Sequence, residues 1–339
     1  MNVKDVVLKT LMEAKSSGLN GGFVSGEELA RFCGVSRMSI WKAVKTLKTQ
    51  GVAIDAATNK GYRYLYTDVF TKDSLTSLLT EKDGFSVRFY DMVDSTNTQA
   101  KRLIMLEDFS VLNSSLHKTV IVSASQSDGY GRFGRSFFSP CGTGIYFSII
   151  YIPKSFVHPG FITASAAVGL CRSIKKIFDV DCGIKWANDI IVSGKKVAGI
   201  LTEGITDFES GSIQAVVIGC GINIVPDNSF PKDLMDKAGS ICSNNIDTKR
   251  NLLCASSVKE ILAILDGDDL YRTYAFQEYR NRSVLRGKKI CVHPVCEGKE
   301  KSYDCTVLDI LDNAVLSVRR EDGTVAFINS GEVTLCDAV

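Results

Sequence analysis

The sequence predicts an α+β multidomain protein with an N-terminal winged helix-turn-helix, a central mixed α/β domain and a C-terminal SH3-like β-barrel. Three observations predict it. The 339 residues exceed one ordinary domain. The first 66 residues are basic, with ten Lys and Arg against five Asp and Glu. The hydrophobic pattern changes twice along the chain, from helical, to alternating strands and helices, to short strands. The predicted domains are 1–66, 82–279 and 280–339, with a linker at 67–81.

The composition excludes several classes of protein. With 45% hydrophobic and 23% charged residues, the chain is not intrinsically disordered. Eleven Cys without a C-x-x-C pair indicate reduced cysteines rather than a zinc ribbon or a dithiol redox site. Three scattered His argue against a histidine metal cluster or a Ser-His-Asp triad. The absence of a signal peptide and of any run of about 20 apolar residues predicts a cytoplasmic protein without a membrane partner.

The helix-turn-helix is predicted from local signals in residues 25–51. Ser25 caps a first helix and forms a capping box with Glu28. Gly34 supplies the turn, Ser36 caps the second helix and Gly51 ends it. The positions expected to face inward are Leu29, Ala30, Phe32, Ile40, Val44 and Leu47. The segment that follows, VAIDA-ATNKG-YRYL, predicts a hairpin and hence a winged helix.

The exposed face of the second helix predicts binding to DNA. It carries Arg37, Ser39, Lys42, Lys45 and Lys48 opposite the apolar stripe. These side chains are donors suited to phosphates and base edges in a major groove. The predicted DNA-binding residues are Ser36, Arg37, Ser39 and Lys42, with Arg37 and Ser39 the candidates for base contacts. The alternative is a solvated lysine face on helices that bind a protein partner.

The central region alternates buried strands with helices. Helices are predicted over 95–106, 159–178 and 252–279. Strands are predicted in FSVRFYDMV, TVIVSAS, GIYFSIIY, CGIKWANDIIV, KVAGILTEG and IQAVVIGCGINIV. The polar stretch 226–250 is predicted to be a surface excursion.

A glycine-rich loop spans Gly129 to Arg135 and matches G-x-G-x-x-G. A dinucleotide fold would open a helix at the third glycine, whereas Pro140 and a β-like run follow here. The loop is therefore predicted to hold a phosphate or acyl phosphate, because glycines let backbone amides approach an anion and Arg132 and Arg135 neutralise it. An exposed turn without function is the alternative. The chain has no P-loop motif.

Three further polar segments lie at strand ends, where sheet-based sites are assembled. They are 94–97, with Ser95, Thr96 and Asn97; 185–189, KWAND, read as part of a strand; and 218–223, ending at Asn223. Helix capping is the alternative role for Ser95. Lys196 abuts an apolar strand and is expected to be partly buried.

The C-terminal region from about residue 280 contains short alternating strands with turns at Asp312-Asn313 and Asp322-Gly323. This pattern predicts the SH3-like barrel. About sixty residues make a marginal domain, so it should pack on the central domain. A purely structural role, as a cap on that domain, is one interpretation of it.

These motifs together resemble the bifunctional biotin protein ligases that also repress biotin genes. The residues that carry the resemblance are STN at 95–97, QSDGYGRFGR at 126–135, KWAND at 185–189, GKKVAGIL at 194–201 and GCGIN at 219–223, together with the N-terminal helix-turn-helix. The resemblance extends over nearly the whole chain. It implies that the central domain has the biotin/lipoate ligase fold.

The resemblance implies a two-step reaction. Biotin and MgATP give biotinyl-5′-AMP, and a lysine of a biotin carboxyl carrier protein then takes the biotin. Arg132 and Lys196 are the implied catalytic residues. The implied biotin-binding residues are Ser95, Thr96, Asn97, Gln126, Tyr130, Gly131, Arg132 and Lys196. The implied ATP- or adenylate-binding residues are Gly129, Gly131, Arg132, Arg135, Phe137, Asn188, Asp189 and Asn223.

The expected metal is the Mg²⁺ that accompanies ATP, without a dedicated protein site; Asp189 or Asn223 are its candidate ligands. The need for Arg132 and Lys196 also follows from the charges of the two substrates. A carboxylate and a triphosphate repel one another, so their approach requires positive charge and aligned amides.

Four residues depart from the family pattern. Tyr130 and Phe133 occupy arginine positions, which predicts weaker retention of the intermediate. Ala187 stands where proline is common, and Phe137 where a tryptophan often stacks on adenine.

The implied partners are the carrier protein, operator DNA and a second copy of the chain. Biotinyl-5′-AMP is the expected corepressor, because it should promote the homodimer that binds DNA. The alternatives are a lipoate or octanoyl ligase, and a ligand-sensing repressor with a degenerate ligase domain.

Overall fold

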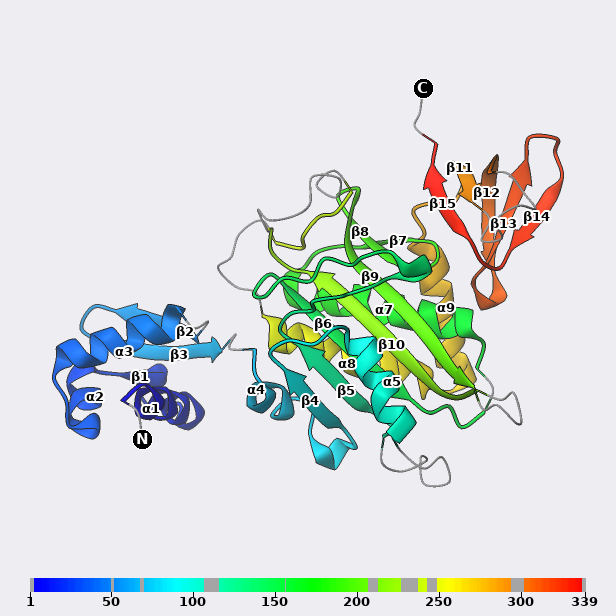
Figure 1. The fold of residues 1–339 in the computed structure, drawn as a ribbon. Helices are drawn as coiled ribbons and strands as arrows, with labels where there is room; N and C mark the ends of the chain where they lie inside the picture. The colour runs from blue at the N-terminus through cyan, green and yellow to red at the C-terminus, as the bar shows by residue number, and fades with distance from the viewer. Residues whose placement is uncertain are drawn as a thin grey trace. The chain divides into compact units, whose positions relative to one another are not determined.

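The computed structural model describes residues 3–49, 52–67, 70–106, 116–155, 157–206, 213–226, 237–242, 249–293 and 302–336. The chain divides into two compact units. The first contains residues 1–74 and 246–251, and the second contains residues 75–245 and 252–339 (Figure 1). The division falls within the predicted linker 67–81, which holds the short helix α4 (Lys72–Thr76).

The first unit has the winged helix-turn-helix arrangement that the sequence predicts. Its elements are α1 (Val3–Ser17), β1 (Phe23–Val24), α2 (Gly26–Cys33), α3 (Arg37–Thr49), β2 (Val52–Ala57) and β3 (Gly61–Thr67). The strands form an antiparallel sheet in the order β1-β3-β2. The Ser25–Glu28 capping box is present, and Gly34 adopts the left-handed conformation with φ 63° that ends α2.

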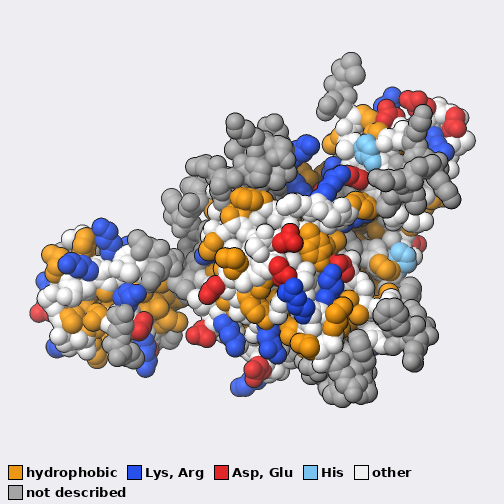
Figure 2. Space-filling view, viewed as in Figure 1, with side chains coloured by type: hydrophobic (Ala, Val, Ile, Leu, Met, Phe, Trp, Pro, Cys, Tyr) orange, Lys and Arg blue, Asp and Glu red, His pale blue; other side chains and the backbone are white. Residues whose placement is uncertain are grey.

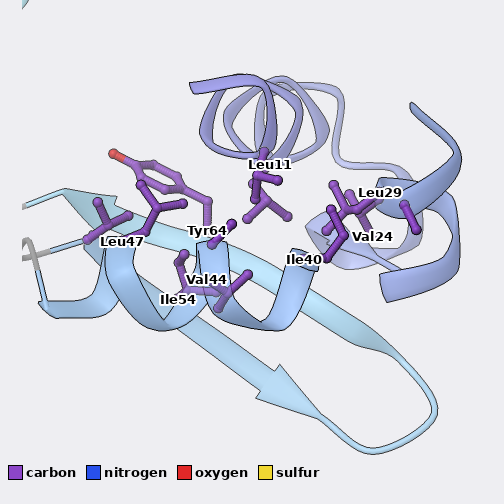
Figure 3. Packing of buried hydrophobic residues seen from close by; sticks show 12 residues of the cluster. Leu11, Val24, Leu29, Ile40, Val44, Leu47, Ile54 and Tyr64 are labelled. Atoms are coloured by element: carbon purple, nitrogen blue, oxygen red, sulfur yellow. The ribbon is translucent and has the colours of Figure 1, made fainter. Parts of the chain in front are cut away.

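The core of the first unit joins all of these elements. Figure 3 shows Leu11 of α1, Leu29 of α2 and the α3 stripe Ile40, Val44 and Leu47 packing with Ile54 and Tyr64 of the hairpin. The inward prediction for Phe32 is wrong, because its side chain is 68% exposed. Leu29, Ala30 and Cys33 form the buried face of α2, and Phe32 lies outside that arc. The predicted helix end at Gly51 lies outside the described residues.

The second unit is built on a seven-stranded sheet in the order β4-β5-β6-β10-β9-β8-β7. Its strands are β4 (Ser86–Tyr90), β5 (Thr119–Ser123), β6 (Gly144–Tyr151), β7 (Gly183–Lys185), β8 (Asp189–Val192), β9 (Lys195–Thr206) and β10 (Ile213–Asn223). The β4–β5 pair is parallel, and the remaining pairs are antiparallel. Every residue of β5 and β6 is buried, as expected for strands covered on both faces.

Helices cover both faces of this sheet. Figure 1 shows α5 (Thr96–Leu106) in front of it and α7 (Pro159–Phe178), α8 (Arg250–Leu265) and α9 (Asp269–Asn281) behind it. The predicted single helix 252–279 is therefore wrong. The helical run stops after Leu265, and Asp268 caps α9 by accepting the Tyr271 amide. The apolar periodicity continues across this short break, which is why the pattern concealed it.

The KWAND segment corrects a second prediction. Lys185 ends β7 and Asp189 begins β8, so residues 186–188 form a turn rather than the middle of a strand. The Trp186–Ala187 peptide is cis. Trp186 is buried, and its indole Nε1 donates to the Ala314 carbonyl at 2.6 Å.

The C-terminal strands form an antiparallel sheet in the order β14-β13-β12-β11-β15. They are β11 (Lys289–His293), β12 (Tyr303–Leu311), β13 (Val315–Arg320), β14 (Val325–Ile328) and β15 (Glu332–Leu335). Both predicted turns are present, with positive φ at Asn313 and Gly323. No pairing closes β14 onto β15 among the described residues, so the closed barrel stays a prediction. Within the described ranges, no helix has the length and apolar character to cross a membrane.

Candidate functional site

The glycine-rich loop lies between β5 and β6 and contains no α-helix. A 3-10 turn covers Arg132–Gly134, with positive φ at Phe133 and Gly134. Two backbone hydrogen bonds shape the loop, from the Gly131 amide to the Arg135 carbonyl and from the Phe137 amide to the Gly129 carbonyl, each 2.7 Å. A side chain at Gly129 would place its Cβ 2.6 Å from the carbonyl oxygen of Phe137. These features agree with the exclusion of a dinucleotide-binding helix.

The two candidate cations, Arg132 and Lys196, contact consecutive residues, Asn188 and Asp189, where the turn after β7 leads into β8. Arg132 donates from Nη1 to Asn188 Oδ1 at 3.3 Å, and Lys196 Nζ lies 2.7 Å from Asp189 Oδ1. The Lys196 side chain is 36% exposed, so it is partly buried as predicted. Burial lowers the pKa of Arg132, although the nearby Asp189 and Glu332 carboxylates act in the opposite direction. A guanidinium still remains charged at neutral pH. Two adjacent cations suit a ligand with two anionic groups.

Phe137 forms an aromatic wall beside these cations. Lys196 Nζ lies 6.0 Å from the centroid of its ring. A Cβ on Gly221 of β10 would lie 2.4 Å from the ring, and one on Gly199 of β9 would lie 3.3 Å from it. The ring therefore lies over the glycines of the sheet, which explains the small residues in the GCG and VAG segments.

Thr96 and Gln126 meet across 30 residues of sequence. The Thr96 amide donates to Gln126 Oε1 at 2.8 Å, and Gln126 Nε2 donates to Ser139 Oγ at 2.8 Å. Ser148 of β6 is fully buried, and its hydroxyl lies 2.8 Å from Thr96 Oγ1 and 2.6 Å from Asn97 Oδ1. The side chains of these residues are thus held by one another before any ligand binds.

Asn97 and Tyr130 both contact Glu203 of β9. Asn97 Nδ2 donates to Glu203 Oε2 at 2.7 Å and to the Leu201 carbonyl at 3.3 Å. Tyr130 donates its hydroxyl to Glu203 Oε2 at 2.8 Å. A Cβ on Gly219 would lie 2.1 Å from Asn97 Oδ1, so only glycine leaves room for this amide.

Ser139, Ser148 and Glu203 belong to this site but were missed by sequence reasoning. All three lie in segments that the sequence pattern predicts as strand or loop, and no recognisable functional motif surrounds any of them. The one available signal was a polar residue interrupting a buried strand, as Ser148 does in GIYFSIIY.

Three predicted residues stand apart from this cluster. Ser95 is buried, and its amide donates to Asp94 Oδ1 at 2.8 Å. Arg135 forms an ion pair with Glu332 of β15, and Arg132 also reaches the C-terminal sheet by donating to the Gly331 carbonyl at 3.1 Å. Asn223 ends β10, and none of the hydrogen bonds among the described residues joins its side chain to Arg132 or Lys196.

The described residues hold no group of three or more His, Cys, Asp or Glu suited to a metal ion. Asp189 offers a carboxylate and Asn223 an amide, a set too small to bind a divalent ion by itself. It is compatible with an ion whose other ligands are phosphate oxygens and water.

The candidate DNA-binding surface is the exposed face of α3. Arg37, Lys42, Lys45 and Lys48 are exposed, whereas the Ser36 hydroxyl accepts the Ser39 amide at 3.2 Å and so caps the helix. Trp41 is 49% exposed, with Lys45 Nζ 5.2 Å from its ring centroid. Figure 2 shows Lys and Arg side chains among hydrophobic ones on this unit. Sequence reasoning missed Trp41, because a large apolar residue is normally assigned to the core.

Comparisons with known proteins agree with both parts of the chain. Residues 89–223 match the Biotin/lipoate A/B protein ligase family, and residues 8–63 match an HTH domain. The Bifunctional ligase/repressor BirA of Bacillus subtilis (strain 168) is 32% identical over 243 residues, which cover 70% of this chain and 72% of that protein.

Two other relatives extend the comparison. The protein of the same name from Escherichia coli (strain K12) is 29% identical over 249 residues, which cover 73% of this chain and 74% of that one. The solved structure of a biotin protein ligase from Aquifex aeolicus in complex with biotin and ATP has the same fold, with a TM-score of 0.57 and 20% identity over 75% of this chain and 99% of that one. The chain belongs to the family of the bifunctional ligase/repressor BirA proteins, in which an HTH domain accompanies a domain of the Biotin/lipoate A/B protein ligase family.

Proposed function

We propose that the protein is an ATP-dependent biotin protein ligase that also represses biotin genes in response to biotin. It forms biotinyl-5′-AMP and pyrophosphate from biotin and ATP, and it then transfers biotin to a lysine of biotin carboxyl carrier protein with release of AMP. The observation that carries the proposal is the pairing of Arg132 with Asn188 and of Lys196 with Asp189, which places two cations at one turn beside the glycine-rich loop.

The two cations serve the first step. Biotin's carboxylate attacks the α-phosphate of ATP, and both groups are anionic. Arg132 and Lys196 reduce the repulsion between them and stabilise the charge that develops on the phosphorus oxygens. The amides of the glycine-rich loop add aligned dipoles to the same region. The proposed bed for adenine is the ring of Phe137.

Asp189 and Asn223 would hold the Mg²⁺ that accompanies ATP, and the ion would supply further neutralisation of the phosphates. Asp189 also orients Lys196 through their 2.7 Å ion pair.

The buried polar network around Thr96, Asn97 and Gln126 is the proposed pocket for biotin's ring system. Its donors already have partners, so little reorganisation is needed when the ring binds. Gln126 Nε2 donates one of its two hydrogens to Ser139 Oγ at 2.8 Å. A ring with polar atoms at its end suits such a pocket better than the apolar chain of an octanoyl group.

The winged helix is the proposed operator-binding module, with Arg37 and Lys42 directed to DNA. Biotinyl-5′-AMP is the proposed corepressor that promotes a homodimer on a two-fold operator, and the cytoplasm is the proposed location. By linkage, operator DNA then favours the adenylate-bound protein by the same factor. Unmodified carrier protein competes for the dimer surface and so relieves DNA binding.

The decisive experiment measures transfer of labelled biotin from biotin and MgATP to a carrier domain. Arg132→Ala and Lys196→Ala should each slow transfer by about 100-fold to 1000-fold, the effect of removing one donor to a developing oxyanion. Arg88→Ala and Lys176→Ala are matched controls, because both side chains are exposed and lie on β4 and α7 rather than on the glycine-rich loop or at the turn.

The outcomes separate the alternatives. Transfer of lipoate in preference to biotin would assign the other ligase activity. Tight binding of biotin without any transfer would leave a ligand-sensing repressor. Equal transfer by all four variants would remove Arg132 and Lys196 from the mechanism.

A further inference from the structure

Glu203 joins three elements that the sequence treats separately. Its Oε2 accepts from Asn97 of α5 and from Tyr130 of the glycine-rich loop, and its Oε1 lies 2.9 Å from Lys101 Nζ, one turn along α5 from Asn97. Lys101 Nζ also lies 5.4 Å from the centroid of the Tyr130 ring. The carboxylate therefore connects the loop both to the predicted biotin pocket and to a cation outside it.

Glu203 is held ionised and Lys101 is held protonated, which strengthens the hydrogen bonds between them and to Tyr130. Burial would raise the pKa of Glu203, but hydrogen bonds from Lys101, Asn97 and Tyr130 outweigh it and hold the pKa below the ordinary glutamate value. Burial likewise opposes the charge of Lys101, yet Glu203 and Tyr130 raise its pKa. The Glu203 side chain is 25% exposed. A carboxylate with three donors and limited solvent contact forms stronger hydrogen bonds than one at the open surface.

The direction of each hydrogen bond also fixes the Asn97 amide. Both hydrogens of Nδ2 are committed, one to Glu203 and one to the Leu201 carbonyl, so Oδ1 must face Ser148. An Asn97 flipped by 180° would direct its oxygen at the Glu203 carboxylate. Glu203 thus fixes the orientation of the Asn97 amide.

We propose that Tyr130 and Glu203 form a latch, supported by Lys101, that positions the glycine-rich loop over the site. Tyr130 occupies a position where the family carries arginine, and the loss of that charge was expected to weaken retention of the intermediate. The latch replaces a cation on the loop by a charge-assisted hydrogen bond to the body of the domain. Tyr130 and Glu203 are positioning residues, because they act through the loop and through Asn97.

The first test needs no ligand. Trypsin cleaves after Arg135, and cleavage requires the loop to leave its place, so its rate reports the open population when opening is fast. In the full-length protein, Tyr130→Phe should raise the rate of cleavage at Arg135 by about tenfold to a hundredfold, the loss of one hydrogen bond to a charged group. Glu203→Gln should raise it by a similar factor.

A matched control variant and a double variant separate the Tyr130–Glu203 hydrogen bond from other effects of the substitutions. Tyr90→Phe also removes a phenolic hydroxyl that contacts α5, since Tyr90 accepts from Gln99 Nε2 at 3.3 Å, but it leaves Glu203 untouched. It should leave the cleavage rate within about twofold of the wild-type rate. The double variant Tyr130→Phe/Glu203→Gln should resemble the more affected single variant, because both changes break the same bond. Cleavage of Tyr130→Phe at the wild-type rate would overturn the latch.

The second test measures retention of the intermediate and rests on the proposed function. Biotinyl-5′-AMP is formed on the enzyme, and its release is followed after a chase with unlabelled biotin. Tyr130→Phe should release it about tenfold faster or more, whereas Glu203→Gln should in addition weaken biotin binding through Asn97. If wild type makes no adenylate, the ligase proposal fails while the proteolysis result still decides the latch. If wild type makes it and Tyr130→Phe releases it no faster, the latch fails while the ligase proposal stands.

Discussion

The predicted ligand site of the second unit and the predicted DNA surface of the first differ in how their side chains are held. Thr96, Asn97 and Gln126 lie in a network of short hydrogen bonds, and glycines of β10 make room for the groups beside them. Arg37 and Lys42 of α3 instead extend from an exposed helix face. The difference indicates that the predicted ligand site recognises its ligand by preformed geometry, whereas the predicted DNA surface uses charged side chains that can adjust to their partner.

The largest expected effect comes from one methyl group in the preformed site. Gly219→Ala should displace the Asn97 amide, whose Oδ1 would lie 2.1 Å from the new Cβ. We expect biotin affinity to fall by about a hundredfold, since the charged hydrogen bond to Glu203 is lost, and the free energy of unfolding to fall by about 1–3 kcal/mol. Titration calorimetry and thermal unfolding measure the two effects.

The control for this variant is Gly204→Ala on the neighbouring strand β9. Among the described residues its Cβ would meet only Ile213, at 4.0 Å, so both quantities should change little. Equal effects of the two variants would show that the ligand site is no more confined than the rest of the sheet.

The DNA surface should respond only to loss of a whole charged side chain. Arg37→Ala is expected to weaken operator binding by about 1–3 kcal/mol and to relax the sequence preference, and Lys42→Ala to reduce the salt dependence of binding by about one unit of slope. Fluorescence anisotropy over a salt series measures both. Lys9→Ala on α1, which removes an exposed lysine paired with Glu13, is the control and should leave the affinity unchanged.

A smaller effect separates the nucleotide part of the ligand site from the biotin part. Gly221→Ala should push aside the Phe137 ring, which would lie 2.4 Å from the new Cβ. Loss of the proposed stacking should raise the KM for ATP by about tenfold, while biotin affinity stays near wild type because Asn97 is not displaced. A parallel loss of biotin affinity would contradict this division of the site.

The smallest expected effect is that of pH on the same site. The pKa of Glu203 is lowered in the folded protein, so its contribution is present above the ordinary glutamate value and is lost as pH falls through the lower folded value. Biotin affinity should therefore be constant from pH 8 down to about pH 4.5 and decline only below the ordinary glutamate value, by about 1 kcal/mol at most because the group is partly exposed. Glu203→Gln should remove this decline, and a decline that begins above pH 6 would assign the titration to another group.

Local sequence signals predicted the winged helix well. Ser25 with Glu28, Gly34 and Ser36 act through contacts within four residues, so the order of residues alone determines these ends. Phe32 was misplaced because the apolar arc of a two-turn helix is narrow, and Leu29, Ala30 and Cys33 occupy it in α2. The break between α8 and α9 escaped notice for a related reason, since apolar residues continue on both sides of it.

The sequence by itself was enough to predict the order of domains and to select Arg132, Lys196 and the STN motif as candidates, because residue types and spacings within a motif are local properties. Only the tertiary structure decided that Arg132 meets Asn188, that Asn97 meets Glu203 and that Tyr130 is held by the same carboxylate. These partners are separated by 56, 106 and 73 positions along the chain. Contacts of that range arise when the sheet places α5, the glycine-rich loop and β9 side by side, and sheet order depends on burial across the whole domain rather than on any single segment.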